Sequence, residues 1–249
     1  MKIVVAALFS ALTLPLSAQE TDQLLLPVAP SVMHCANNAE FATRLVVYNR
    51  NRRPVQLQCA AAACGDVSAV AGRAMEGPEV LDAYPSFLYL PKSDAEGVGM
   101  SLLVESNPMD HPEDRELQEL PIVRASDFRA SKLTLVGLRM DPGDRQALRI
   151  FGLDGTFGQV MVRAFDLSTN ELLYEEEHSV WPLTDERTAD GRPLRPALSI
   201  ECNVFSELPQ VSGQYVRIEI EPITPGYRIW SLISVTNNKT QHFYTIVPR

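Results

Sequence analysis

Short apolar runs that alternate with polar residues constrain this chain more than any other feature. Clear examples are Lys132–Leu135, Val160–Phe165 and Val216–Glu221. Side chains at this spacing point alternately to the two faces of a β-strand, so one face is buried while the other meets water. The 18 prolines and 13 glycines punctuate the runs, and no stretch after the N-terminal segment has a convincing helical period. The pattern predicts an all-β protein of antiparallel sheets.

Two local signals predict specific connections between strands. The segment Gln159–Glu177 is typical of a hairpin, with Leu167–Asn170 as its turn. The segment Asp141–Asp144 has the sequence Asp-Pro-Gly-Asp, which places turn-forming residues at turn positions. We interpret both segments as structural.

Two stretches of the chain have similar sequences. Leu26–Leu57 resembles Leu120–Ile150, and Gly97–Leu103 resembles Gly226–Ile233. Self-similarity on this scale indicates a duplicated module of about 100 residues, although chance resemblance between two β-rich halves is the alternative. We therefore predict two tandem antiparallel β-sandwich modules, residues 24–117 and 118–249, joined near the acidic stretch Asn107–Asp114.

The same segments resemble one family. The strand Thr43–Asn49, the run Arg53–Leu57 and the ending Asn237–Pro248 are similar to immunoglobulin-like β-sandwich modules, which occur, often in tandem, in uncharacterised secreted bacterial proteins. The resemblance implies the fold and an exported location, and it transfers no catalytic residue. The first copy departs from the pattern, because Cys59–Cys64 has no counterpart in the second.

The first 18 residues are typical of a secretory signal peptide. Lys2 precedes an apolar core, and small residues end at Ala18 before a polar stretch. The alternative is a membrane anchor, but the apolar run Ile3–Ala18 contains Pro15 and falls short of the roughly 20 residues that a span requires. We expect a secreted or periplasmic protein with no membrane span.

The four cysteines indicate two disulfides, because an even number in an exported chain is typical of oxidised proteins. Four alanines separate Cys59 from Cys64, so these two residues are placed to close a small loop. That pairing leaves Cys35 with Cys202. The alternative is a metal cluster of His34, Cys35, Cys59 and Cys64, although zinc sites usually have a shorter spacing between paired cysteines.

Charge and motifs exclude several classes of function. Twenty-two basic against 31 acidic residues give a net charge of −9, which argues against a general nucleic-acid binder. The sequence contains no nucleotide-binding loop, nucleophile elbow, zinc-protease motif or dinucleotide fingerprint. We therefore predict no catalytic residue, no bound metal and no cofactor.

Three groups of charged residues are candidate functional sites. In Glu175–His178, alternation places Glu176 and His178 on one face of a strand. One interpretation is that His178 acts as a general base. The favoured interpretation is a solvated edge strand. Two acidic loops have oxygen ligands of the kind that calcium takes, but plain turns are favoured. The loops contain Asp110, Glu113 and Asp114, and Asp185, Glu186 and Asp190.

The third group is the basic cluster around Tyr48 and Asn49. It is a candidate patch for an anionic partner, and a charged turn between strands is the alternative. Its members are Arg44, Arg50, Arg52 and Arg53. Trp181 and Trp230 are interpreted as core or edge residues rather than as sugar platforms.

These observations lead to three hypotheses of function. The first is an exported, non-enzymatic protein with a structural or partner-binding role at the cell envelope, its partner a protein or a glycan. The second is a periplasmic chaperone-like protein that binds a client strand at a sheet edge. The third is a secreted hydrolase that uses carboxylates or His178.

Overall fold

The computed structural model describes residues 20–27, 39–60, 69–80, 84–108, 116–206, 208 and 213–248. The predicted signal peptide, residues 1–18, lies outside them. The first half contains β1 (Thr21–Leu26), β2 (Ala39–Asn49), β3 (Val55–Gln56), β4 (Ala69–Val70), β5 (Met75–Val80), β6 (Ser86–Pro91), α1 (Lys92–Ala95), β7 (Val98–Pro108), β8 (Glu116–Leu120) and β9 (Val123–Arg124). The second half follows a single 3-10 turn, Ala125–Asp127, and contains β10 (Leu133–Met140), β11 (Asp144–Gly152), β12 (Gly158–Asp166), β13 (Leu172–Pro182), β14 (Ala197–Cys202), β15 (Gln214–Pro222), β16 (Ile229–Asn237) and β17 (Phe243–Ile246).

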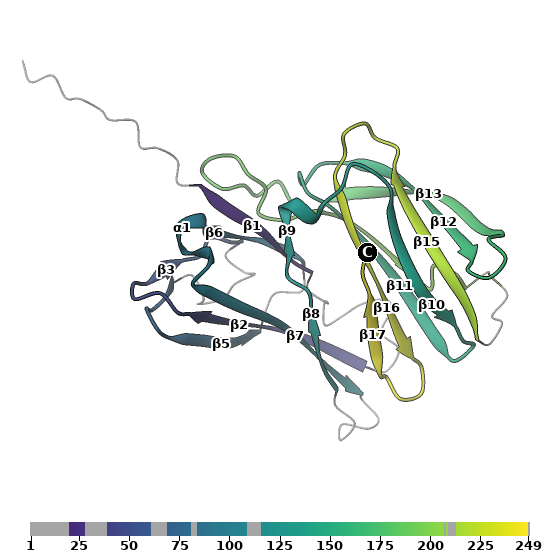
Figure 1. Ribbon diagram of the computed structural model, residues 1–249, viewed down its shortest axis with the longest axis horizontal. Helices are drawn as coiled ribbons and strands as arrows, with labels where there is room; N and C mark the ends of the chain where they lie inside the picture. Colours follow the sequence, from purple (N-terminus) through teal and green to yellow (C-terminus); the bar gives the residue numbers. More distant parts are fainter. Residues whose placement is uncertain are drawn as a thin grey trace, which may run out of the picture.

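The strands form antiparallel sheets, which confirms the predicted all-β class. The first half forms a four-stranded sheet of order β5-β2-β7-β8, a three-stranded sheet of order β6-β1-β9 and the short pair β3-β4. The second half forms one eight-stranded sheet of order β10-β15-β12-β13-β14-β11-β16-β17. Figure 1 shows the two halves side by side, with β8 and β9 next to the strands of the second half.

The eight-stranded sheet folds back on itself into a nearly closed barrel. β13 forms the corner, because it pairs with β12 along most of its length and with β14 only at Trp181 and Pro182. The edge strands β10 and β17 approach each other but do not pair. The core between the two layers is mainly aliphatic, with Leu135, Ile150 and Ile218 among its members, and it also contains Phe205 and Tyr227.

The sheet β6-β1-β9 is covered on both faces, and it joins the two halves. Leu24 and Leu26 of β1 pack in the core of the first half. Leu25 points the opposite way, into a cluster that includes Phe151 of β11 and Trp230 of β16. Strands buried on both faces have continuous apolar runs instead of alternation, which accounts for the sequence Leu-Leu-Leu in β1. The sheets therefore stack in four layers, with β1 in an inner one.

The local connections agree with the sequence. β12 and β13 form the predicted hairpin, and Asn170 in its turn has a φ of 61°, a conformation that asparagine tolerates. The turn at Asp141–Asp144 joins β10 to β11, with the Asp144 N–H donating to the Asp141 carbonyl. The predicted domain boundary between residues 117 and 118 falls within β8, and the chain enters the eight-stranded sheet only at Leu133.

Candidate functional site

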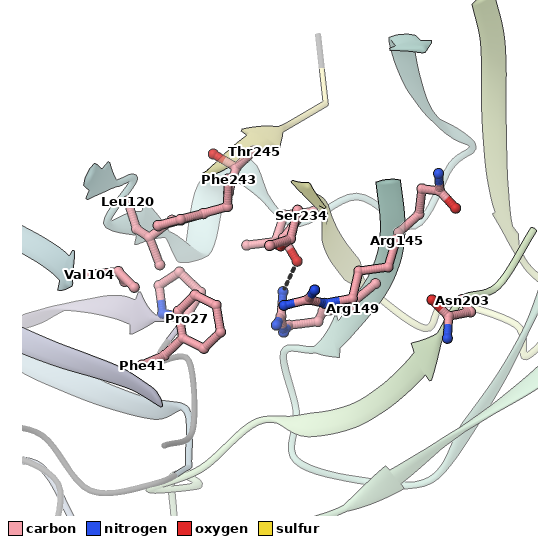
Figure 2. A pocket seen from close by; sticks show the side chains of 14 residues that line it. Pro27, Phe41, Val104, Leu120, Arg145, Arg149, Asn203, Ser234, Phe243 and Thr245 are labelled. Carbon is pink, nitrogen blue, oxygen red and sulfur yellow. Dashed lines mark hydrogen bonds between the residues drawn. The ribbon is translucent and has the colours of Figure 1, made fainter. Parts of the chain in front are cut away.

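A pocket lies where the first half meets β11, β16 and β17 (Figure 2). One wall is apolar, and the other carries polar and cationic side chains. The first half contributes the apolar residues Pro27, Phe41, Val104 and Leu120, and the second half contributes Arg145, Gln146, Ala147, Arg149, Asn203, Leu232, Ser234, Thr236, Phe243 and Thr245. Its volume is about 40 Å³.

The alternation of β11 places two arginines in this pocket. Leu148 and Ile150 of β11 face the core of the second half. Residues 145 and 149 therefore face the first half, since neighbouring residues of a strand point to opposite faces. Arg145 is only 6% exposed and Arg149 only 7%, which is uncommon for arginine.

Neutral hydrogen-bond acceptors hold the arginine side chains. Arg145 donates from Nη1 to Asn238 Oδ1 at 2.8 Å and from Nη2 to Gln241 Oε1 at 2.7 Å. Arg149 donates from Nη1 to Ser234 Oγ at 2.9 Å (Figure 2). Asn238 and Gln241 lie in the turn between β16 and β17, so this turn fixes the direction of the Arg145 guanidinium.

Burial weakens the hydration of both cations. It lowers the pKa of the Arg149 guanidinium to about 10 and also lowers that of Arg145. The reason is that a low-dielectric environment disfavours the charged form. Both groups nevertheless stay protonated at neutral pH, so the pocket has a poorly solvated positive wall that attracts anions.

The lining favours binding over chemistry. Among the described residues that line the pocket there is no His, Cys, Asp or Glu, so no side chain there is suited to general acid–base catalysis near neutral pH. Ser234 accepts its hydrogen bond from a guanidinium, which does not activate a nucleophile.

Comparisons with known proteins do not assign the chain. No protein-family model, no curated protein and no solved structure matches it. In the part of the chain that the structure describes, no helix is long and apolar enough to cross a membrane.

His178 lies inside the structure, away from this pocket. As predicted, Glu175 and Glu177 share one face of β13, while Glu176 and His178 share the other. β13 lies between β12 and β14 in the sheet order. It pairs with β14 only at Trp181 and Pro182, so the segment Glu175–His178 pairs with β12 alone, as in an edge strand. The His178 ring is buried; its Nε2 is 3.2 Å from the Tyr174 hydroxyl, and its Nδ1 is 3.5 Å from a Glu201 carboxylate oxygen.

Three of the four arginines of the predicted basic patch have separate partners. Arg44 lies in β2 and pairs with Glu105 at 3.2 Å. Arg53 pairs with Asp94 at 2.8 Å, and Arg50 donates to the Glu96 carbonyl at 2.9 Å. Arg52 is exposed in the turn after β2. The carboxylates lower the net positive charge of this region, and its role as a partner patch stays a prediction.

Of the two acidic loops, one has arginines beside its carboxylates and the other lies outside the described residues. Asp190 pairs with Arg192 at 2.9 Å, and Glu186 lies 3.6 Å from Arg195, so these loop carboxylates are matched by cations. The loop with Asp110, Glu113 and Asp114 is not among the described residues. Within the described ranges, no group of three or more acidic, histidine or cysteine side chains is placed to hold a metal ion.

Cys59 and Cys202 are both disulfide-bonded, and no described cysteine is free. Cys35, Cys64 and His34 lie outside the described residues, so the pairing remains a prediction.

The sequence interpretation missed Arg145 and Arg149. The available signal was their spacing of four within the apolar run Arg145–Phe151, which places both on one strand face. Of the two tryptophans, Trp230 is buried as expected, whereas Trp181 is 61% exposed and packs on Phe157 with the rings tilted by 55° and their centroids 4.7 Å apart.

Proposed function

We propose that this protein is an exported, non-enzymatic binding protein with a structural or partner-binding role at the cell envelope. The observation that carries the proposal is the pocket between the halves, which offers buried cationic donors but no acid, base or activated nucleophile among its described lining residues. Binding without turnover is the activity that this lining supports best.

Two further observations support an exported protein of tandem immunoglobulin-like sandwich modules. The strand order β2-β7-β8 in the first half has a counterpart in β11-β16-β17 in the second, and β7 and β16 overlap the similar stretches Gly97–Leu103 and Gly226–Ile233. The N-terminal apolar segment and the disulfide-bonded state of Cys59 and Cys202 agree with an oxidising compartment.

The test combines location, partner and turnover. A tagged chain is expressed in its own host, its cell fractions are analysed, and mild crosslinking followed by mass spectrometry identifies what it contacts in the envelope. We expect a processed protein in the envelope or medium and a partner that binds again when both are purified. Retention of the uncleaved chain in the cytoplasm, or turnover of a glycan or small molecule that is lost in His178→Gln, contradicts the proposal.

A second candidate function is strand binding at the open seam of the eight-stranded sheet. At one end of the seam, Tyr244 of β17 lies close to Arg139 of β10. At the other end, a cavity of about 480 Å³ separates Leu133 from Val247 and Pro248. Two unpaired edges facing such a gap suit an added extended peptide.

Calorimetric titration with extended peptides of alternating apolar residues tests this candidate. We expect saturable binding that is unchanged in Trp181→Ser, since the exposed pair Phe157 and Trp181 is a separate apolar surface. A flat titration, or binding that Trp181→Ser abolishes, contradicts strand addition at the seam.

A further inference from the structure

We propose that the pocket between the halves binds a small carboxylate with a short apolar chain. The proposal names the ligand class of the site whose binding role is proposed above, and it rests on that role. Three properties of the pocket carry it: two buried cations, an opposite apolar wall, and a volume that admits only a few heavy atoms.

The cationic wall suits a carboxylate. Arg145 and Arg149 project from the same face of β11, and a guanidinium matches the planar geometry of a carboxylate with two parallel donors. Within the described residues, no carboxylate forms an ion pair with Arg145, whose recorded partners are the amide oxygens of Asn238 and Gln241. A bound anion would offset the desolvation of the Arg145 charge.

Ser234 adds a hydroxyl donor beside the cations. Its oxygen accepts the bond from Arg149 Nη1 at 2.9 Å, and a serine hydroxyl retains one hydrogen that it donates itself. The pocket therefore combines charge with directional donors, as a carboxylate requires.

The opposite wall selects for an alkyl group. Phe41 of β2, Val104 and Leu120 line it. Phe41 meets Phe243 of β17, which belongs to the same sheet as the arginines, edge to face with ring centroids 5.7 Å apart. Inorganic phosphate would place hydrated oxygens against these side chains at a cost in free energy. An alkyl chain on a carboxylate would instead be removed from water.

The volume limits the length of that chain. One water molecule needs at least about 10–15 Å³ by the same measure, so the pocket of about 40 Å³ holds about three waters. This space fits acetate or propionate and excludes sugars, nucleotides and long fatty acids.

Isothermal titration calorimetry of the purified mature protein, at constant ionic strength, tests the ligand class. The titrants are formate, acetate, propionate and inorganic phosphate. We expect saturable binding of the carboxylates, tightening about fourfold with each added carbon, and weaker binding of phosphate. An absence of saturable carboxylate binding, or phosphate binding as tightly as propionate, overturns the proposal.

Two variants test the site. Arg149→Met and Arg145→Met each remove a cation while nearly keeping the side-chain volume, and we expect each to weaken propionate binding by at least about tenfold. Arg163→Gln is the matched control, since Arg163 pairs with Glu175 and Glu221 on an exposed surface; its affinity should equal that of the wild type. Thermal unfolding checks that each variant folds. If one of the two arginine variants does not fold, the other tests the site.

Unchanged binding in a folded arginine variant overturns the proposed site. The two proposals fail separately: a confirmed envelope partner without carboxylate binding refutes only the ligand class. Turnover that is lost in His178→Gln refutes the binding function, whether or not propionate binds.

Discussion

Replacing Leu25 by alanine tests whether the inner sheet β6-β1-β9 holds the two halves together. The Leu25 side chain is 0% exposed. It belongs to the cluster that contains Phe87 of the first half and Phe151 and Trp230 of the second. The substitution removes three buried carbons from a layer that is enclosed on both faces, where the surroundings have little freedom to collapse into the space.

The expected loss is large. Leu→Ala substitutions in protein cores cost about 2–5 kcal/mol, depending on how far the cavity closes. For a chain of this size, each kcal/mol lowers Tm by roughly 2–4 °C. We therefore expect Leu25→Ala to lower the Tm by roughly 5–15 °C.

Trp230 provides a reporter in the other half of the chain. It is 5% exposed whereas Trp181 is 61% exposed, so a Trp181→Phe background leaves a single buried fluorophore. Thermal unfolding is then followed by Trp230 fluorescence and by far-UV circular dichroism. We expect both signals to shift together, because Leu25 and Trp230 share one cluster.

Two leucine substitutions serve as comparisons. Leu26→Ala removes an equally buried side chain that faces the other core, which consists of residues of the first half and Phe243 of β17. Leu172→Ala removes the same atoms from an exposed position, where changes are usually within about 0.5 kcal/mol. If Leu25→Ala leaves the Trp230 transition within 2 °C, on the order of that surface effect, the inner sheet does not couple the halves and the reasoning is wrong.

Three further predictions follow from buried contacts and oxidised cysteines. Burial raises the pKa of Tyr227, so the contribution of this side chain to stability is complete below the unfolded pKa of about 10 and is lost as pH rises above it. The urea midpoint of Tyr227→Phe should therefore fall less above pH 10 than that of the wild type. An equal fall in the two midpoints contradicts this. A Cβ on Gly158 would lie 2.3 Å from the Tyr227 ring, so Gly158→Ala should lower the free energy of unfolding by about 1–3 kcal/mol in urea. Gly143→Ala, whose Cβ would have its nearest atom at 3.8 Å, should be nearly neutral. Equal losses of stability in the two variants refute the clash. Peptide mapping without reduction should recover Cys35 linked to Cys202, and a free thiol at either position refutes that pairing.

The strands could be predicted from the sequence more fully than their partners. The period of two in Val160–Phe165 identifies a strand with one buried face, and β12 has that pattern. The run Phe87–Leu90 is buried throughout, and periodicity alone does not distinguish such a strand from a buried helical segment. That β6 lies beside β1 depends on contacts between residues 60 to 70 positions apart, which no local pattern encodes.

The candidate site was harder to predict for a different physical reason. Arg163 also lies on a strand within an apolar run, yet it faces water and pairs with Glu175 and Glu221. Arg145 and Arg149 have similar neighbours in the sequence, but their strand is covered by the first half of the chain. The surroundings of these arginines are therefore set by the packing of the sheets, which becomes known only from the fold.

The inner position of β1 has a consequence for the order in which the protein matures. β1 leaves the ribosome long before β16, and one face of β1 is completed by Trp230 and Leu232 of β16. At about 5–20 residues per second, roughly 10–40 s of synthesis separate the two strands. Throughout that interval one face of the leucine-rich strand β1 lacks its final packing partners, so the nascent chain depends on protection from aggregation until β16 is made.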